Sequence, residues 1–159
     1  MDIFACIQNK DLEELRKNLK FNLDINARNY NGWTALAQCC RYDWFEGLKY
    51  LIENGADINK TSNYGYTPLF LCSAYKFEKG LKYLLEKGAN PNIQANNGNT
   101  ALHHIRSSSF IEYAKLLLMN DADPNIKNNE NESAYVQAIN LKDTKLINLY
   151  HKYNNTSKN

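Results

Sequence analysis

Cysteine and histidine are the residues of this chain best suited to metal binding or nucleophilic chemistry. Three of the four cysteines, Cys6, Cys39 and Cys72, follow one another at intervals of 33 residues. A metal site needs ligands that converge on one point, whereas equivalent residues of stacked helices lie about 10 Å apart. The fourth, Cys40, is adjacent to Cys39 and makes no ligand pair with it. We therefore expect the cysteines to be small buried apolar residues and predict no metal site.

The adjacent histidines His103 and His104 are the other candidates for chemistry. A catalytic histidine needs a nucleophile or a carboxylate within hydrogen-bonding reach, and no repeating position of the chain supplies one. The sequence also lacks a Gly-rich phosphate loop, a Cys-x-x-Cys pair and a Gly-x-Ser-x-Gly elbow. We predict that the protein is not an enzyme and uses no cofactor.

Composition narrows the class of protein further. With 159 residues, 43% hydrophobic and 23% charged, the chain has the size and balance of one soluble globular domain. A net charge of +2 with interspersed signs gives no basic stripe for nucleic acid. There is no apolar run of about 18 residues for membrane insertion and no secretory signal. We expect a cytoplasmic protein with reduced thiols, in a host cell if it is a delivered effector.

A period of 33 residues organises the elements that position these side chains. Each unit has a turn glycine or its substitute: Gly32, Gly65, Gly98 and Asn131. A hydroxyl residue follows two positions later: Thr34, Thr67, Thr100 and Ser133. A second position of the repeat is glycine in two units and aspartate in the third: Gly55, Gly88 and Asp121. Another position of the repeat is asparagine in every unit: Asn26, Asn59, Asn92 and Asn125. A fixed period of this length predicts a repeat architecture.

Each unit is predicted to form a turn, a helix, a short turn, a second helix and a loop. In the clearest unit Thr67 caps a helix that begins at Pro68 and ends near Tyr75. The second helix is expected from about Glu78 to Lys87, closed by Gly88. The second helices carry a narrow apolar stripe: Leu48, Leu51, Ile52; Leu81, Leu84, Leu85; Ala114, Leu117, Leu118. One unit cannot bury such a stripe alone, so stacking into a solenoid is predicted.

The motifs NGWTALA, GYTPLF and GNTALHH, closed by NGADIN, KGANPN and NDADPN, resemble those of the ankyrin repeat family. The resemblance implies an all-α solenoid of stacked antiparallel helix pairs with projecting β-turn fingers. It covers a single domain, residues 1–153, followed by a disordered tail, 154–159. The domain comprises a cap (1–28), three repeats (29–61, 62–94, 95–127) and a second cap (128–153). It also implies that His103 hydrogen-bonds neighbouring backbone and ties adjacent turns together.

Polar residues in the end units and two glycines inside helices depart from the expected helix pattern, and Asn131 with Glu132 replaces the glycine-led turn in the last unit. Asn18 and His151 place polar groups in the apolar stripes of the two end units, as the outer faces of a finite stack require. Gly47 and Gly80 fall in the second helices, where each costs about 0.5–1 kcal/mol. A close helix approach and a duplication of the segment GLKYL are both compatible with these glycines.

Aromatic residues indicate where a partner would bind. In the ankyrin geometry the finger tips and the ends of the first helices face the concave side, and exposed aromatics are enriched at interface hot spots. Towards the C-terminus the fingers carry amide and acidic residues instead. The predicted partner-binding residues are Tyr30, Trp33, Arg41, Tyr42, Tyr64, Tyr66, Tyr75, Asn97, Asn99, Glu130 and Glu132. The alternative for Trp33 and Tyr66 is packing between neighbouring fingers.

We expect the protein to bind another protein through this concave surface and to be a monomer when unbound. It would act by occupying its partner, as an inhibitor, an adaptor or an effector; immunity-type and host-capturing roles follow only from the habits of the family. The alternative is a self-associating scaffold, in which Tyr150 and Tyr153 near the end of the chain support end-to-end stacking.

Overall fold

The computed structural model describes residues 2–20 and 24–156, with side chains as far as Asn154. The chain divides into two compact units, Met1–Ala89 (unit 1) and Asn90–Asn159 (unit 2), so the single domain expected from the sequence stays a prediction. Within the described residues every regular element is helical, and extended pairing is limited to isolated bridges. The predicted all-α class is confirmed. No helix of the described part is long and apolar enough to cross a membrane.

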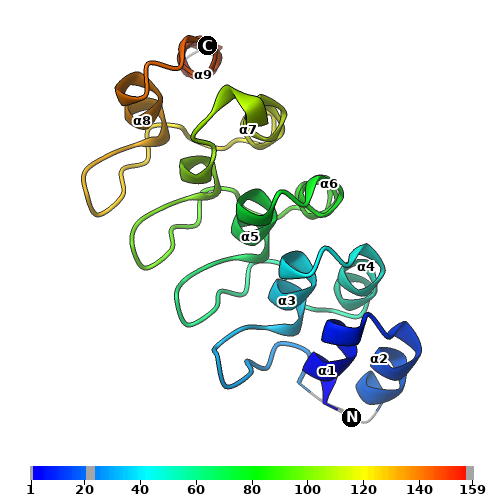
Figure 1. The fold of residues 1–159 in the computed structure, drawn as a ribbon. Coiled ribbons are helices and arrows are strands. Elements are labelled where there is room, and N and C mark those ends of the chain that lie inside the picture. The colour runs from blue at the N-terminus through cyan, green and yellow to red at the C-terminus, as the bar shows by residue number, and fades with distance from the viewer. Residues whose placement is uncertain (1, 21–23, 157–159) are drawn as a thin grey trace. The chain divides into compact units, whose positions relative to one another are not determined.

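The described part of unit 1 forms three helix pairs whose first helices pack side by side, as do their second helices (Figure 1). The pairs are α1 (Ile3–Asn9) with α2 (Leu12–Leu19), α3 (Ala35–Arg41) with α4 (Phe45–Glu53), and α5 (Pro68–Tyr75) with α6 (Glu78–Glu86). We call α1, α3 and α5 the inner helices and α2, α4 and α6 the outer helices. The loops before α3 and α5 project to one side as fingers (Figure 1). Each helix pair therefore buries its apolar stripe by stacking in register on the next pair.

Local sequence signals set the helix boundaries. The hydroxyl of Thr67 accepts a hydrogen bond from the Phe70 amide at 3.1 Å, and Pro68 occupies the first turn of α5. Thr34 caps α3 in the same way through the Ala37 amide. After α6 the chain turns at Gly88 with a φ of +84°, a conformation that costs glycine little. The predicted bounds of both helices in this repeat are confirmed to within one residue.

The cysteines lie in the core of unit 1. Cys6, Cys39, Cys40 and Cys72 are all fully buried and not in disulfides. Burial raises the pKa of the Cys6 thiol, and raises it most strongly for Cys39 and Cys72. These thiols stay protonated and pack as small apolar groups, as predicted. The described residues contain no group of three or more His, Cys, Asp or Glu side chains that could hold a metal ion.

Gly47 and Gly80 have a packing role that the sequence did not reveal. Each follows by three residues a buried aromatic, Trp44 or Phe77, that stands just before an outer helix. A Cβ at either glycine would overlap the ring of that aromatic residue. In the third repeat, Tyr113 takes the glycine position and the ring that precedes it meets it edge-on. The glycines therefore leave room for the rings of Trp44 and Phe77 against the start of the helix.

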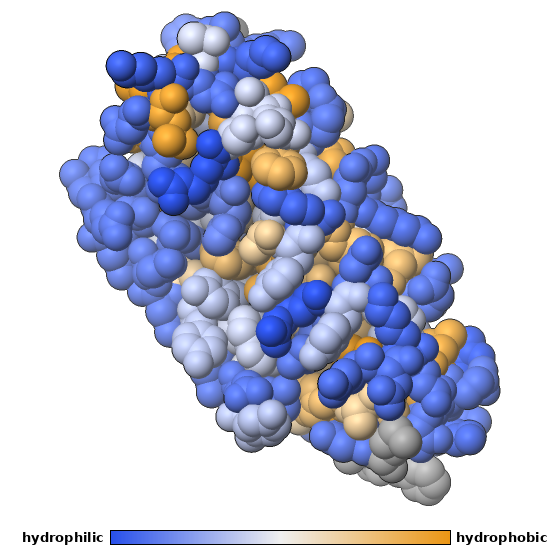
Figure 2. Space-filling model, in the orientation of Figure 1, coloured by the Kyte–Doolittle hydropathy of each residue, from blue (hydrophilic) through white to orange (hydrophobic). Residues whose placement is uncertain are grey.

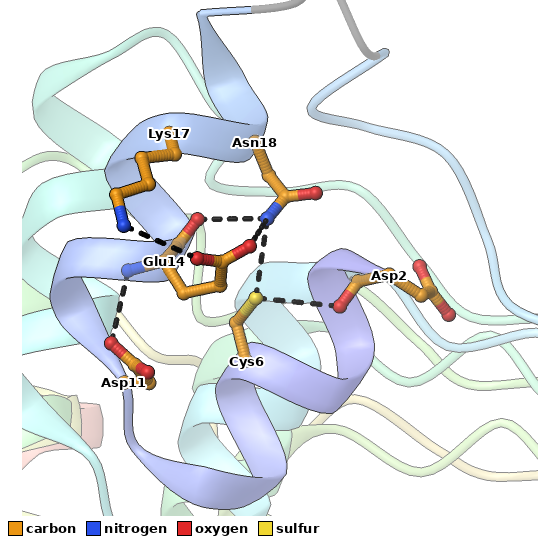
Figure 3. Close-up of polar contacts among 6 residues, drawn as sticks. All are labelled: Asp2, Cys6, Asp11, Glu14, Lys17 and Asn18. Atoms are coloured by element: carbon orange, nitrogen blue, oxygen red, sulfur yellow. Dashed lines mark hydrogen bonds and ion pairs between the residues drawn. The ribbon is translucent and has the colours of Figure 1, made fainter.

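A group of polar contacts surrounds Asn18 in the first helix pair (Figure 3). The Asn18 amide nitrogen donates to the Glu14 carbonyl oxygen at 2.8 Å and to the Glu14 carboxylate at 3.2 Å. It also lies 3.5 Å from the Cys6 sulfur. Asp11 caps α2 by accepting from the Glu14 amide at 2.9 Å. The side-chain nitrogen of Asn18 is thus hydrogen-bonded within the first helix pair, in agreement with a polar end face.

Unit 2 departs from the predicted repeat in its first helix. The described elements are η1 (Ala101–His104), η2 (Ser108–Phe110), α7 (Ile111–Leu118), α8 (Ala134–Asn140) and α9 (Thr144–Thr156). The helix expected after Thr100 is only a short 3₁₀ turn, so that prediction is wrong. The Ser107 hydroxyl accepts from the Ser109 amide at 3.2 Å, and Asp143 accepts from the Ser108 amide at 2.7 Å. These side chains offer the backbone partners outside a helix.

The end of unit 2 differs from two expectations, the disordered tail and the free Tyr150. Helix α9 continues to Thr156, three residues into the segment predicted to be disordered, and residues 157–159 lie outside the described part. The amide of Asn125 donates to the Asn154 side-chain oxygen at 2.8 Å, which ties this turn to the preceding loop. Tyr150 is fully buried in the position that Leu117 holds one repeat earlier, and burial raises its pKa. Tyr150 is therefore unavailable for end-to-end stacking.

Candidate functional site

Hydrogen bonds join the neighbouring fingers of unit 1 to each other. Gly32 and Gly65 turn the finger tips with φ values of +77° and +78°. The Asn63 amide donates to the Gly32 carbonyl oxygen at 3.1 Å and so joins one finger to the next. The guanidinium of Arg28 donates to the Thr61 carbonyl oxygen at 2.7 and 2.9 Å. The fingers form a fixed platform for the side chains that they carry.

Aromatic rings from both fingers stack on this platform. Trp33 and Tyr66 are stacked with centroids 6.0 Å apart and planes 15° apart. Tyr66 stacks in turn on the buried Phe70 of α5 at 4.5 Å. Tyr64 lies 5.9 Å from Trp33 and 6.1 Å from Tyr66. The alternative for Trp33 and Tyr66 is thus observed: both are half-buried between fingers, and Tyr64 forms the exposed edge of the stack.

Arg41 links the fingers to the inner helices. Its guanidinium lies 5.0 Å from the centroid of the Trp33 ring and 5.9 Å from that of Tyr75. Its Nε donates to the Tyr75 hydroxyl at 3.4 Å, and its Nη1 to the Gln38 side-chain oxygen at 3.5 Å. A guanidinium between two rings gains about 0.5–2 kcal/mol from cation–π attraction. We call Trp33, Arg41, Tyr64, Tyr66 and Tyr75 the aromatic–arginine patch.

Exposed apolar area in unit 1 is concentrated on this side. The large apolar side chains exposed in its described part are all tyrosines, on finger tips or at the ends of inner helices. They are Tyr30 (96% exposed), Tyr42 (39%), Tyr64 (55%) and Tyr75 (52%). Figure 2 shows side chains of intermediate hydropathy, drawn near white, over the region of α3, α5 and the fingers. Clustered exposed aromatics of this kind are typical of an interaction surface.

Three of the four predicted contact residues of unit 2 form side-chain hydrogen bonds within that unit. The Asn97 side chain accepts from the Asn99 amide at 3.0 Å, and Asn99 accepts from the Asn128 side chain at 2.8 Å. The Glu132 carboxylate accepts from the Asn140 side chain at 3.2 Å. Asn97 and Glu130 are exposed, whereas Asn99 and Glu132 are half-buried. A partner contact by these four residues stays a prediction.

His103 has a structural position in unit 2. Its Nδ1 accepts from the Thr100 amide at 3.0 Å, and its Nε2 lies 3.1 Å from the Glu132 carbonyl oxygen, which accepts its proton. The side chain is buried, and desolvation lowers its pKa against the opposing effect of the Glu132 carbonyl. The neutral imidazole therefore ties one finger to the next, as the resemblance implies.

Two residues that support the patch lie outside the predicted set. Phe70 backs the aromatic stack from within α5, and Arg28 joins the two fingers. A signal for Phe70 was present, because it stands four residues after Tyr66 and in the first turn of the next helix. Arg28 has no such local signal, since its partner Thr61 is 33 residues away.

Stacked helix pairs with projecting, hydrogen-bonded fingers define a helical repeat protein that offers a preformed surface. The family model described as "Ankyrin repeats (3 copies)" matches residues 3–95, and that described as "Ankyrin repeat" matches residues 97–129. The chain belongs to the ankyrin repeat family. Proteins of this family are generally protein–protein interaction modules and typically not enzymes. A search of curated proteins gives no match.

Proposed function

We propose that the protein binds one partner protein through the aromatic–arginine patch and the adjoining Tyr30 and Tyr42. It acts by occupying that partner, as an inhibitor, an adaptor or an effector. The observation that supports this most is that exposed large apolar side chains in the described part of unit 1 are confined to tyrosines on this side. Tyrosine brings a large, rigid contact area at a low cost in side-chain entropy.

The preformed surface supports the same proposal. Finger-to-finger hydrogen bonds and ring stacking already fix Trp33, Arg41 and Tyr66, so binding would order few groups. The free, buried thiols are compatible with a reducing compartment, and we place the function in the cytoplasm.

The test is to capture the partner on the immobilised protein, purify it and measure its affinity for variants. Tyr64→Ala and Tyr75→Ala should each weaken binding by about 2 kcal/mol, or roughly thirtyfold. Because both side chains are more than half exposed, the urea midpoint should change little. Tyr50→Ala is the matched control, since Tyr50 lies on the outer helix α4 beneath Arg16. Unchanged affinity in both test variants would show that the surface is wrongly placed.

Self-association is the second candidate, and one observation favours it. Val136, Ile139 and Leu141, in or just after α8 of unit 2, are 36%, 47% and 47% exposed. Val136 and Ile139 stand three residues apart and therefore on one helix face. Sedimentation velocity over a dilution series separates the two functions: a monomer at every concentration removes the assembly candidate, whereas a concentration-dependent oligomer supports it.

A further inference from the structure

Charge is segregated between the two sides of unit 1. The fingers and inner helices of its two repeats, the equivalent ranges 25–42 and 58–75, contain three cations and no aspartate or glutamate. The cations are Arg28, Arg41 and Lys60. By contrast, the ion pairs in the described part of unit 1 all lie within outer helices: Glu13–Arg16, Glu14–Lys17, Lys49–Glu53 and Glu78–Lys82. The side that carries the tyrosines is therefore positively charged.

Arg41 is the cation most favourably placed to meet a partner. It is half-buried among rings, and its two hydrogen bonds, at 3.4 and 3.5 Å, go to the neutral oxygens of Tyr75 and Gln38. Among the described residues it forms no ion pair, and the carboxylate nearest in sequence, Asp43, lies beyond the end of α3. A guanidinium fixed by stacking presents its remaining N–H donors in the fork that matches a carboxylate.

We propose that the partner presents an acidic segment, in which an aspartate or glutamate pairs with Arg41 and a neighbouring apolar side chain packs on Tyr64 and Tyr75. This inference rests on the proposed function and specifies the chemistry of the partner. The positive side of unit 1 would attract such a segment and disfavour a basic one. The tyrosines supply contact area, and Arg41 supplies the selectivity for charge.

A single-stranded nucleic acid could also use arginine and aromatic residues, because its phosphates and bases pair and stack with them. The structure favours a protein segment for two reasons. The net charge of the chain is only +2. The rings of Trp33 and Tyr66 are already engaged with each other, and Arg41 lies over the first and Phe70 stacks on the second. Trp33 and Tyr66 therefore offer little free ring face for base stacking.

The experiment uses a library of random short peptides displayed on phage, selected on the full-length protein. Selected peptides should be enriched in aspartate or glutamate beside an apolar residue. Arg41→Gln should weaken a selected peptide about tenfold. Arg16→Gln is the matched control, because it removes the same charge and a similar arginine–tyrosine contact, 5.6 Å from the Tyr50 ring, on the outer helix α2. Changing the peptide's Asp or Glu to Asn or Gln should cause the same loss of affinity for the wild-type protein. This second measurement does not depend on how a protein variant folds.

The outcomes separate this inference from the proposed function. Selected peptides that are basic or uncharged, and weakened by Tyr64→Ala but not by Arg41→Gln, would overturn the acidic segment and leave the binding surface in place. Peptides insensitive to both substitutions, or no selected peptide at all, would overturn both. Tighter binding of a single-stranded oligothymidylate, lost in Arg41→Gln, would assign the surface to nucleic acid and overturn both as well.

Discussion

Gly47 should resist substitution by alanine even though it lies inside a helix. In a helix that begins at Phe45, replacing glycine with alanine ordinarily gains up to about 1 kcal/mol, because alanine loses less backbone entropy on folding. Here the added methyl group would overlap the ring of Trp44, which is buried in the core. Forcing one methyl group into such a contact costs about 1–3 kcal/mol. We expect Gly47→Ala to lower the free energy of unfolding by about 1–2 kcal/mol.

The same substitution should change sign when the ring is removed. Trp44→Leu removes the ring and should by itself lower the free energy of unfolding by about 0.5–3 kcal/mol. In that background Gly47→Ala meets no ring and should raise the free energy of unfolding by about 0.5–1 kcal/mol. The double-mutant cycle would then give a coupling energy of about 1.5–3 kcal/mol between positions 44 and 47. Gly80→Ala with Phe77→Leu repeats the cycle in the next repeat, where a Cβ at the glycine would also overlap the preceding ring.

Urea unfolding of the four proteins, followed by far-ultraviolet circular dichroism, measures these differences. Circular dichroism is preferable to tryptophan fluorescence because one of the two tryptophans, Trp44, is itself changed. The slope m should stay constant across the set, so that shifts of the midpoint report stability. A stabilising Gly47→Ala in the wild-type background would refute the packing explanation. So would an effect of equal sign and size in both backgrounds, since the ring would then have no influence on position 47.

Two further predictions concern buried polar groups. Burial lowers the pKa of His103 below its usual 6.5, so the folded protein binds fewer protons at this site than the unfolded chain. The stability that the neutral His103 contributes is therefore complete above about pH 6.5. It is lost as the pH falls from there through the folded-state pKa. Urea midpoints between about pH 5 and 8 should show this loss in the wild type and a smaller one in His103→Gln; equal losses would contradict it. The Ser73 hydroxyl is buried without a hydrogen-bond partner in the described part of the chain, so Ser73→Ala should raise the free energy of unfolding by about 1 kcal/mol, and a lower urea midpoint would contradict that.

Features that depend on local hydrogen bonds could be predicted from the sequence. The bond from Phe70 to the Thr67 hydroxyl spans three residues, and the turn at Gly88 follows directly from the helix that it closes. Asn131 and Asp121 replace glycine in these turns with φ values of +63° and +65°, which asparagine and aspartate tolerate better than most residues. The 33-residue period then places one repeat against the next, because identical apolar stripes can be buried only in register.

The shortened first helix of the third repeat could not be predicted in this way. Asp143, which holds the Ser108 amide, comes 35 residues later in the chain. The 33-residue alignment shows equivalent positions in the two repeats, but it does not show this bond. A polar residue that reaches back from the next repeat can outweigh the helical tendency of a segment that contains three consecutive serines.

By itself, the sequence determined the repeat, the boundaries of the helices in the clearest unit, the burial of the cysteines and the side on which the aromatics gather. These properties follow from periodicity and from contacts between near neighbours in the chain. Only the tertiary structure decided which of those aromatics are free. Trp33 and Tyr66 stack on each other across 33 residues, and Arg41 reaches Tyr75 across 34. Such contacts depend on side-chain rotamers in two adjacent repeats at once, and that is why the exposed surface reduces to the tyrosines around a fixed arginine.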